Sequence, residues 1–148
     1  MTQGGLSDHM PAERGLVIAA LANLVWINVS EVFRYFAFVM PMLREAFPSI
    51  ADVAPMNVPV FLVWGVWDTI LVAAVTGFAW LFLDRFGATL RNAVLFGTAL
   101  WLSIFVILWL GLYNMNLATP RIALTALPLA WFEMVMAALI VRWAMRRG

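Results

Sequence analysis

Four long apolar segments, separated by short polar stretches, dominate the pattern of hydrophobic and polar positions along the chain. They cover approximately residues 16–41, 58–83, 93–117 and 122–141. Each segment is long enough to cross about 30 Å of hydrocarbon as an α-helix rising about 1.5 Å per residue. Strands of a membrane β-barrel alternate in polarity, whereas these segments are continuously apolar. The pattern predicts an all-α integral membrane protein: one transmembrane domain, residues 1–148, folded as an antiparallel bundle of four transmembrane helices.

The connections between the segments contain residues that favour helix ends. Gly87 follows the second segment and suits a helix C-cap, where a left-handed backbone is common. Thr119 and Pro120 precede the fourth segment, and their residue types suit the N-cap and the first helical position. The longer loop at 44–57 is expected to be a plain connection on the extracytoplasmic side. The alternative is that it lies on the membrane surface, since Ile50, Val53 and Met56 alternate with polar residues.

Composition supports the assignment to a membrane and excludes several functions. The chain is 65% hydrophobic and 11% charged, against about half and a quarter in soluble domains, so lipid must solvate much of its surface. There is no cysteine for disulfides or thiol catalysis and no lysine for a retinal Schiff base, and the only histidine, His9, lies in the polar N-terminal tail. We therefore expect neither a metal nor a cofactor, and the net charge of +1 argues against a nucleic-acid partner.

Four charged residues stand well inside the apolar segments, and they are Glu31, Arg34, Asp68 and Glu133. Charges at such positions are costly and usually face protein or water. Counted from the outer helix ends, the three acids are each about ten to twelve residues deep, near the bilayer midplane, with Arg34 about one turn further out. Their similar depth predicts one polar layer between the helices.

The neighbours of these residues indicate which way they face. At about 100° per residue, Asn28 and Tyr35 share a polar arc of the first helix with Glu31 and Arg34, which are close enough to pair. Beside Asp68, small residues recur at every fourth position, at Thr69, Ala73 and Gly77. Small residues let another helix approach closely. Glu133 lies on an alanine face of the fourth helix formed by Ala126, Ala130, Ala137 and Ala144.

The third helix carries no charge at this depth, and we expect it to close the bundle with Ser103, Ile107 and Gly111. Asn114 ends that helix on the outer side with Tyr113 and Asn116, where these residues are expected to be polar caps or to form the lip of a cavity. If Asp68 has a purely structural role, we expect it to hydrogen-bond to Tyr35 or Asn114. The candidate site thus consists of Glu31, Arg34, Asp68, Glu133, Asn28, Tyr35 and Asn114.

Three acids and one arginine in an apolar layer cannot all be charged at low cost. We expect at least one acid to hold a proton near neutral pH, or the layer to bind a cation. Glu133 is the first candidate for the proton because its own helix offers it no basic neighbour.

Three classes of function fit these features. The first is a proton- or cation-linked transporter or channel subunit, which would have to form a homo-oligomer or join a partner membrane subunit to build a transport path. The second is a binding protein or membrane enzyme for a lipophilic ligand, since small bundles with membrane-embedded acids are similar in layout to the sterol-isomerase and sigma-2-receptor group. The third is a structural or assembly subunit whose polar layer only fixes helix packing. The sequence leaves open whether the protein is an enzyme.

Four spans predict a multi-pass protein, which we expect in a bacterial inner membrane. The placement of the arginines predicts that both termini lie in the cytoplasm. Positively charged residues favour the cytoplasmic side, and only Arg44 and Arg121 fall on the opposite side from Arg14, Arg85, Arg91, Arg142, Arg146 and Arg147. Reporter fusions at the C-terminus should therefore be active as cytoplasmic reporters and inactive as extracytoplasmic ones. The opposite pattern would contradict this topology.

Overall fold

The structure, a computed structural model, describes residues 10–147, so His9 lies outside the described residues. The described chain forms helical segments that join into four rods. The first rod contains α1 (Met10–Arg34), the π-helical segment η1 (Tyr35–Val39) and α2 (Met40–Ala46). The second is α3 (Val58–Phe86), and the fourth is α6 (Pro120–Met145). The third contains α4 (Leu90–Trp101), the π-helical segment η2 (Leu102–Val106) and α5 (Ile107–Asn114).

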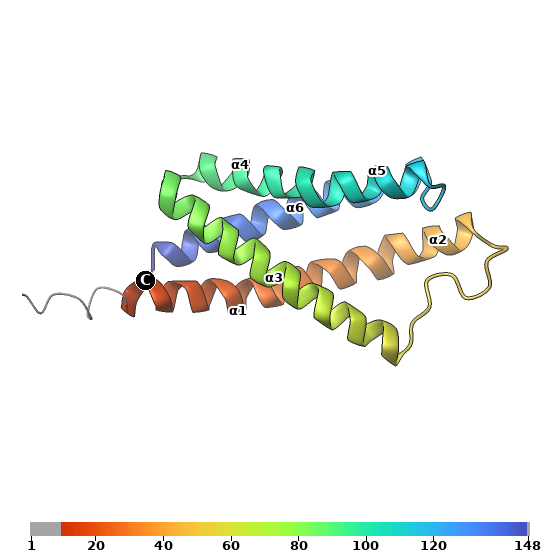
Figure 1. Ribbon diagram of the computed structural model, residues 1–148, viewed down its shortest axis with the longest axis horizontal. Coiled ribbons are helices and arrows are strands. Elements are labelled where there is room, and N and C mark those ends of the chain that lie inside the picture. Colours follow the sequence, from red (N-terminus) through yellow and green to blue (C-terminus); the bar gives the residue numbers. More distant parts are fainter. Residues whose placement is uncertain (1–9, 148) are drawn as a thin grey trace, which may run out of the picture.

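Each rod contains a helix that is long and apolar enough to cross a membrane. These spans are Glu13–Ala46, Val58–Phe86, Leu90–Asn114 and Pro120–Met145. They pack as a bundle (Figure 1), which confirms the predicted all-α fold with four candidate transmembrane helices. The exposed surface of the bundle is rich in large apolar side chains, as contact with a lipid bilayer requires.

The predicted helix ends at Gly87, Thr119 and Pro120 are confirmed. Gly87 ends α3 with a φ of 96°, a conformation that favours glycine. The Thr119 side chain accepts a hydrogen bond from the Ile122 N–H at 3.3 Å, and Pro120 begins α6. These residues therefore act at the helix ends as their types predict.

Several other helix ends differ by a few residues from the approximate predicted ones, and two of the differences have a local cause. The first rod continues past Pro41 to Ala46, and we attribute this to η1, in which the Met40 N–H bonds to the Tyr35 carbonyl five residues back. The wider π-helical turn leaves room for a proline that would interrupt a regular α-helix. The third rod ends at Asn114 instead of near residue 117 because Asn116 adopts a left-handed backbone with a φ of 57°.

Helix α6 is the most buried of the four spans and packs against α1, α3 and α4. Its alanine face is fully buried, as predicted, at Ala126, Ala130, Ala137 and Ala144. Small side chains on α6 allow its neighbours to approach closely. The closest approach is to Gly97 of α4, where a Cβ atom would lie 2.6 Å from the Val135 Cα.

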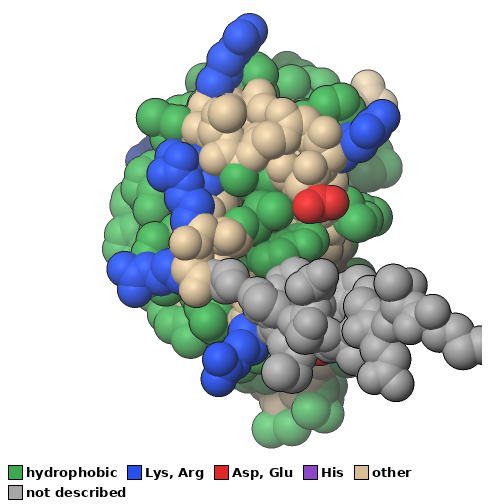
Figure 2. Space-filling model, turned by 90° about the vertical axis from the view of Figure 1, so that its left-hand side faces the viewer, with side chains coloured by type: hydrophobic (Ala, Val, Ile, Leu, Met, Phe, Trp, Pro, Cys, Tyr) green, Lys and Arg blue, Asp and Glu red, His purple; other side chains and the backbone are tan. Residues whose placement is uncertain are grey.

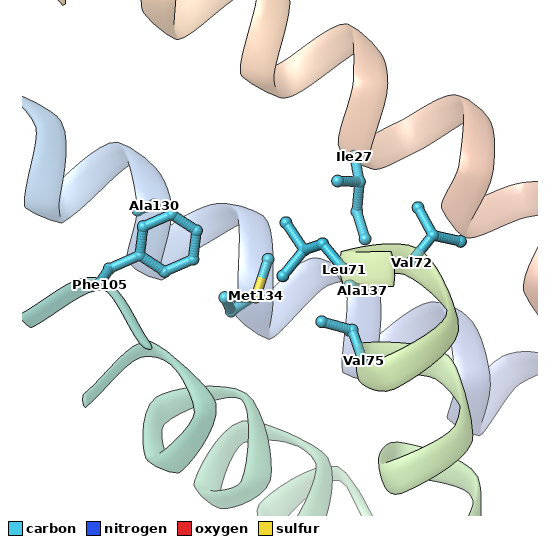
Figure 3. Packing of buried hydrophobic residues seen from close by; sticks show 8 residues of the cluster. All are labelled: Ile27, Leu71, Val72, Val75, Phe105, Ala130, Met134 and Ala137. Carbon is cyan, nitrogen blue, oxygen red and sulfur yellow. The ribbon is translucent and has the colours of Figure 1, made fainter. Parts of the chain in front are cut away.

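A hydrophobic cluster from α1, α3, η2 and α6 fills the middle of the bundle. Figure 3 shows the Leu71 and Met134 side chains lying near one another between α3 and α6, with Ile27 of α1 directed towards them. Phe105 of η2 lies beside Ala130 on the other side of α6. The cluster holds α3 on the bundle through its second half.

The predicted inward stripe of α3 is wrong. Thr69 and Ala73 are exposed, and a Cβ atom at Gly77 would meet no atom within 4 Å. The buried face of α3 instead contains Asp68, Leu71, Val72, Val75, Thr76, Ala79 and Leu83. The reason is that α6 already presents alanines, so the space beside it is filled by the larger side chains of α3.

The prediction that Ser103, Ile107 and Gly111 close the bundle is also wrong. Ser103 and Ile107 are exposed, and a Cβ atom at Gly111 would meet nothing within 4 Å. The π-helical segment η2 interrupts the α-helical period, so the residues after it are rotated away from the face that a continuous helix would present. Phe105 and Trp109 occupy the inward positions instead.

One end of the bundle is rich in arginine. The first turns of α1 and α4 and the last turns of α3 and α6 meet there, and Figure 2 shows arginine side chains spread around this end. The described arginines that belong to these turns and to the C-terminus are Arg14, Arg85, Arg91, Arg142, Arg146 and Arg147. Which side of a membrane this end faces stays a prediction.

Replacing Gly97 with alanine should destabilise the bundle, because the new Cβ would lie 2.6 Å from Val135 and 2.9 Å from the Met134 carbonyl oxygen. Overpacking of this kind typically costs about 1–3 kcal/mol. Gly77→Ala is the matched control, since nothing lies within 4 Å of its Cβ position. Unfolding in mixed detergent micelles should show a loss for Gly97→Ala only. Equal stability of both variants would mean that α4 and α6 do not approach this closely.

Candidate functional site

The polar face of α1 points into the bundle, as its periodicity predicts. Asn23, Glu31 and Arg34 are buried, whereas Val25 and Val29 on the opposite face are exposed. Trp26 also joins this face to α6, because its indole N–H donates to the Glu133 backbone carbonyl at 3.0 Å. The contact faces of α1 and α6 are thereby fixed at the depth of Glu133.

Arg34 joins two acids from different helices. One guanidinium nitrogen, Nη1, donates to Glu133 Oε2 at 2.9 Å, and the other, Nη2, donates to Glu31 one turn earlier on α1. The Ser30 hydroxyl also donates to Glu133 Oε2, at 2.8 Å. The Phe105 ring of η2 lies 5.0 Å from the guanidinium carbon, within the range of a cation–π interaction. Arg34 is thus enclosed by α1, α6 and η2.

The cluster is not fully paired. The second carboxylate oxygen of Glu133, Oε1, is buried and has no hydrogen-bond partner. Asp68 of α3 is only 7% exposed, and among the described residues no hydrogen bond or ion pair reaches its carboxylate. Asp68 belongs to the buried face of α3, which packs against both α1 and α6. Three of the predicted residues are therefore in direct contact, and Asp68 lies near them without touching Arg34.

The other predicted site residues lie outside this contact network. Asn28 is half-buried and donates to the Leu24 carbonyl of its own helix at 2.8 Å. Tyr35 packs against Trp64 of α3, with ring centroids 4.8 Å apart. Asn114 is exposed at the end of α5. Neither Tyr35 nor Asn114 makes the hydrogen bond to Asp68 that a purely structural role predicts.

Sequence reasoning missed two contributors to the cluster and one polar contact near it. Ser30 belongs to the polar arc of α1, so its position was a usable signal, whereas nothing in the sequence marks Phe105. Deeper in the bundle, the Asn23 amide donates to the Thr76 hydroxyl at 3.0 Å and to the Ala137 carbonyl at 3.3 Å. The Asn23 carbonyl oxygen has no partner, so it is a second buried acceptor without a donor.

Glu133 has a basic neighbour that its own helix does not reveal, because Arg34 reaches it from α1. The reason for choosing Glu133 as the proton carrier is therefore incomplete, and which acid holds the proton stays a prediction. Glu31 and Glu133 therefore share the one guanidinium, and Asp68 is the acid without a counter-ion contact. Among residues 10–147, no group of three His, Cys, Asp or Glu side chains is placed to hold a metal ion. Chemically, the carboxylates of the cluster can bind and release a proton, or a cation that needs only one carboxylate ligand.

Comparison of the chain with protein-family models, with curated proteins and with solved structures finds no match. The chemistry of this protein must therefore be inferred from its own residues.

Breaking the buried pair from one side should cost more than removing both partners. Arg34→Leu leaves Glu133 buried and unpaired, and such changes typically cost about 3–5 kcal/mol. Adding Glu133→Leu to Arg34→Leu removes one of the two carboxylates that lose their partner, the other being Glu31, and should recover part of the loss. Unfolding in mixed micelles measures both variants.

The control for this cycle is Arg121→Leu, because Arg121 and Glu45 form an ion pair 3.2 Å long with both side chains exposed. Exposed pairs are worth about 0–1 kcal/mol. Losses from Arg34→Leu and Glu133→Leu that simply add in the double variant would contradict an energetic coupling between them.

Proposed function

We propose that this protein is a proton-linked membrane transport subunit and that its carboxylate cluster carries the proton. The observation that carries the proposal is the imbalance of the cluster: three buried carboxyl groups face one guanidinium. Ionisable groups buried at membrane depth commonly mark proton or ion pathways. The cluster consists of Glu31, Arg34, Asp68 and Glu133.

Charge explains why a proton is the expected ligand. With every group ionised, three carboxylates and one guanidinium leave two negative charges in an apolar layer, which is costly. The third rod adds no charge at this depth, since its only charged residue is Arg91 in the first turn of α4. A metal ion would need several converging oxygen ligands, and the described residues offer no such group. A proton needs only one carboxylate oxygen.

The unpaired oxygens favour this function over a purely structural one. A layer that only fixed helix packing would be expected to satisfy its buried polar atoms, because an unsatisfied acceptor costs free energy. Glu133 Oε1 has no partner and Asp68 makes no ion pair. Both acids therefore offer an oxygen to which a proton can bind, and protonation of Asp68 leaves the ion pairs of Arg34 unchanged.

Proton movement in proteoliposomes tests the proposal. Vesicles with a trapped pH indicator and an inside-negative potassium diffusion potential should acidify faster with the wild type than without protein. Asp68→Asn and Glu133→Gln should slow this acidification about tenfold, since buried acids serve as proton relays. Glu45→Gln is the control, because the Glu45 side chain is 68% exposed and lies outside the cluster.

Infrared titration of the same variants gives an independent readout. The wild type should show a protonated carboxyl band near neutral pH that weakens in Asp68→Asn or Glu133→Gln and is unchanged in Glu45→Gln. Wild-type vesicles that acidify no faster than empty ones, together with three acids ionised at neutral pH, would overturn the proposal.

A further inference from the structure

An aromatic cluster lies one helical turn from the ion cluster, between the first two rods. Trp64 of α3 is its centre, and its ring contacts Tyr35 with centroids 4.8 Å apart. Phe61 and Phe36 surround the same indole, with centroids 6.2 Å and 6.4 Å away. These rings meet edge to face.

Asp68 lies one helical turn along α3 from the centre of this aromatic cluster. Trp64 and Asp68 are four residues apart on α3, so their side chains lie on the same face, one turn apart. On the first rod, Tyr35 follows Arg34 and lies four residues after Glu31. The unpaired carboxylate of α3 and the ring of Trp64 are therefore neighbours in the same interface between α1 and α3.

Within residues 10–147, no cation contacts the Asp68 carboxylate. Arg34 is the only basic residue of these at this depth, and its two terminal nitrogens are occupied by Glu31 and Glu133. Asp68 is 93% buried, because 7% of its surface is exposed. A buried carboxylate without a donor or counter-ion is expected to recruit one.

We propose that Asp68, with the rings of Trp64 and Tyr35, binds a lipophilic organic cation, an ammonium group with apolar substituents. This inference rests on the proposed proton-linked function, because the cation and the proton would compete for the same carboxylate. Binding requires no covalent step: the ammonium forms an ion pair with the carboxylate, and a proton held there leaves to water.

The chemistry of the site favours an organic cation over a metal ion. Aromatic rings attract ammonium groups through their faces, most strongly when water is excluded. The protein already uses this interaction for its own cation, since the Arg34 guanidinium lies 5.0 Å from the Phe105 ring centroid. One free carboxylate beside aromatic rings matches an ammonium group, whereas a metal ion would need further oxygen ligands.

The surroundings of the site suit a ligand that dissolves in lipid. The first half of α3 diverges from α2 and α5 (Figure 1), and its side chains Phe61, Val63 and Trp67 are about half exposed or more. In a bilayer this part of α3 is surrounded by hydrocarbon. An apolar cation can therefore reach the interface from the membrane without crossing the arginine-rich end.

Binding of phenyltrimethylammonium tests the charge requirement without any mutation. Its neutral isostere, tert-butylbenzene, has the same shape and no charge. Quenching of tryptophan fluorescence in the intact purified protein should show saturable binding of the cation and at least about tenfold weaker binding of the isostere, since losing a desolvated cation–π contact and an ion pair costs at least that factor. Equal binding of the two compounds would overturn the proposal.

Variants then locate the site. Asp68→Asn should abolish saturable binding, and Trp64→Leu should weaken it about three- to tenfold, in the range of one cation–π contact. The matched controls are Asp84→Asn and Trp67→Phe, which change an exposed acid and an exposed tryptophan of the same helix. Unchanged affinity in Asp68→Asn would overturn the site.

The competition with protons separates this inference from the proposed function. Affinity for the cation should fall as the pH is lowered, because protonation removes the carboxylate charge. The charged and titratable groups at this depth on the elements packed against α3 are Glu31 and Arg34 of α1, Tyr35 of η1 and Glu133 of α6. If the carboxyl groups titrate in the infrared experiment and the protein carries protons but binds no cation, this inference alone is refuted. Saturable cation binding without any proton movement would instead refute the proposed function.

Discussion

Pairing a guanidinium inside an apolar bundle is the constraint on which the arrangement of these helices depends. Arg34 lies deep in the first span, where it needs acceptors that lipid cannot supply. Glu31 supplies one from the same helix, but Glu133 must come from α6, and this places the two helices at one relative rotation and depth. The Trp26 and Asn23 hydrogen bonds to α6 backbone carbonyls agree with that placement. A rotation of α1 by one residue would break all of these contacts together.

The close packing of α6 decides where α3 can lie. Its alanines and Gly97 allow α1 and α4 to approach closely on two sides, so α3 packs on the remaining surface through large side chains of its second half. The third rod does not cover the first half of α3, and the apolar side chains there are left exposed. Asp68 lies at the boundary between these halves. This explains how a carboxylate can be buried and still lack a partner.

Local patterns in the sequence predicted the four spans, the helix ends at Gly87 and Thr119, and the alanine face, because each depends on residues close together in the chain. Two features could not be predicted in this way. The π-helical segments after Arg34 and around Phe105 change the helical period, and no residue type marks them. The pairing of Arg34 with Glu133 joins residues 99 positions apart, so inspecting the helix of Glu133 gave the wrong view of its charge environment. The small-residue stripe failed because α6, not α3, provides the close approach.

The acids of the cluster differ in how far the packing of the bundle depends on their charge. Glu31 and Glu133 share Arg34, and their charges hold α1 and α6 together. Changing their charge therefore disturbs the packing of the bundle as well as any ligand. Asp68 contributes no ion pair, so its charge can change with little effect on how the helices are joined. A site that binds and releases a ligand needs such a group, held by a rigid scaffold but not required by it. Its position beside Trp64, at the start of the uncovered part of α3, gives that group the access that the paired acids lack.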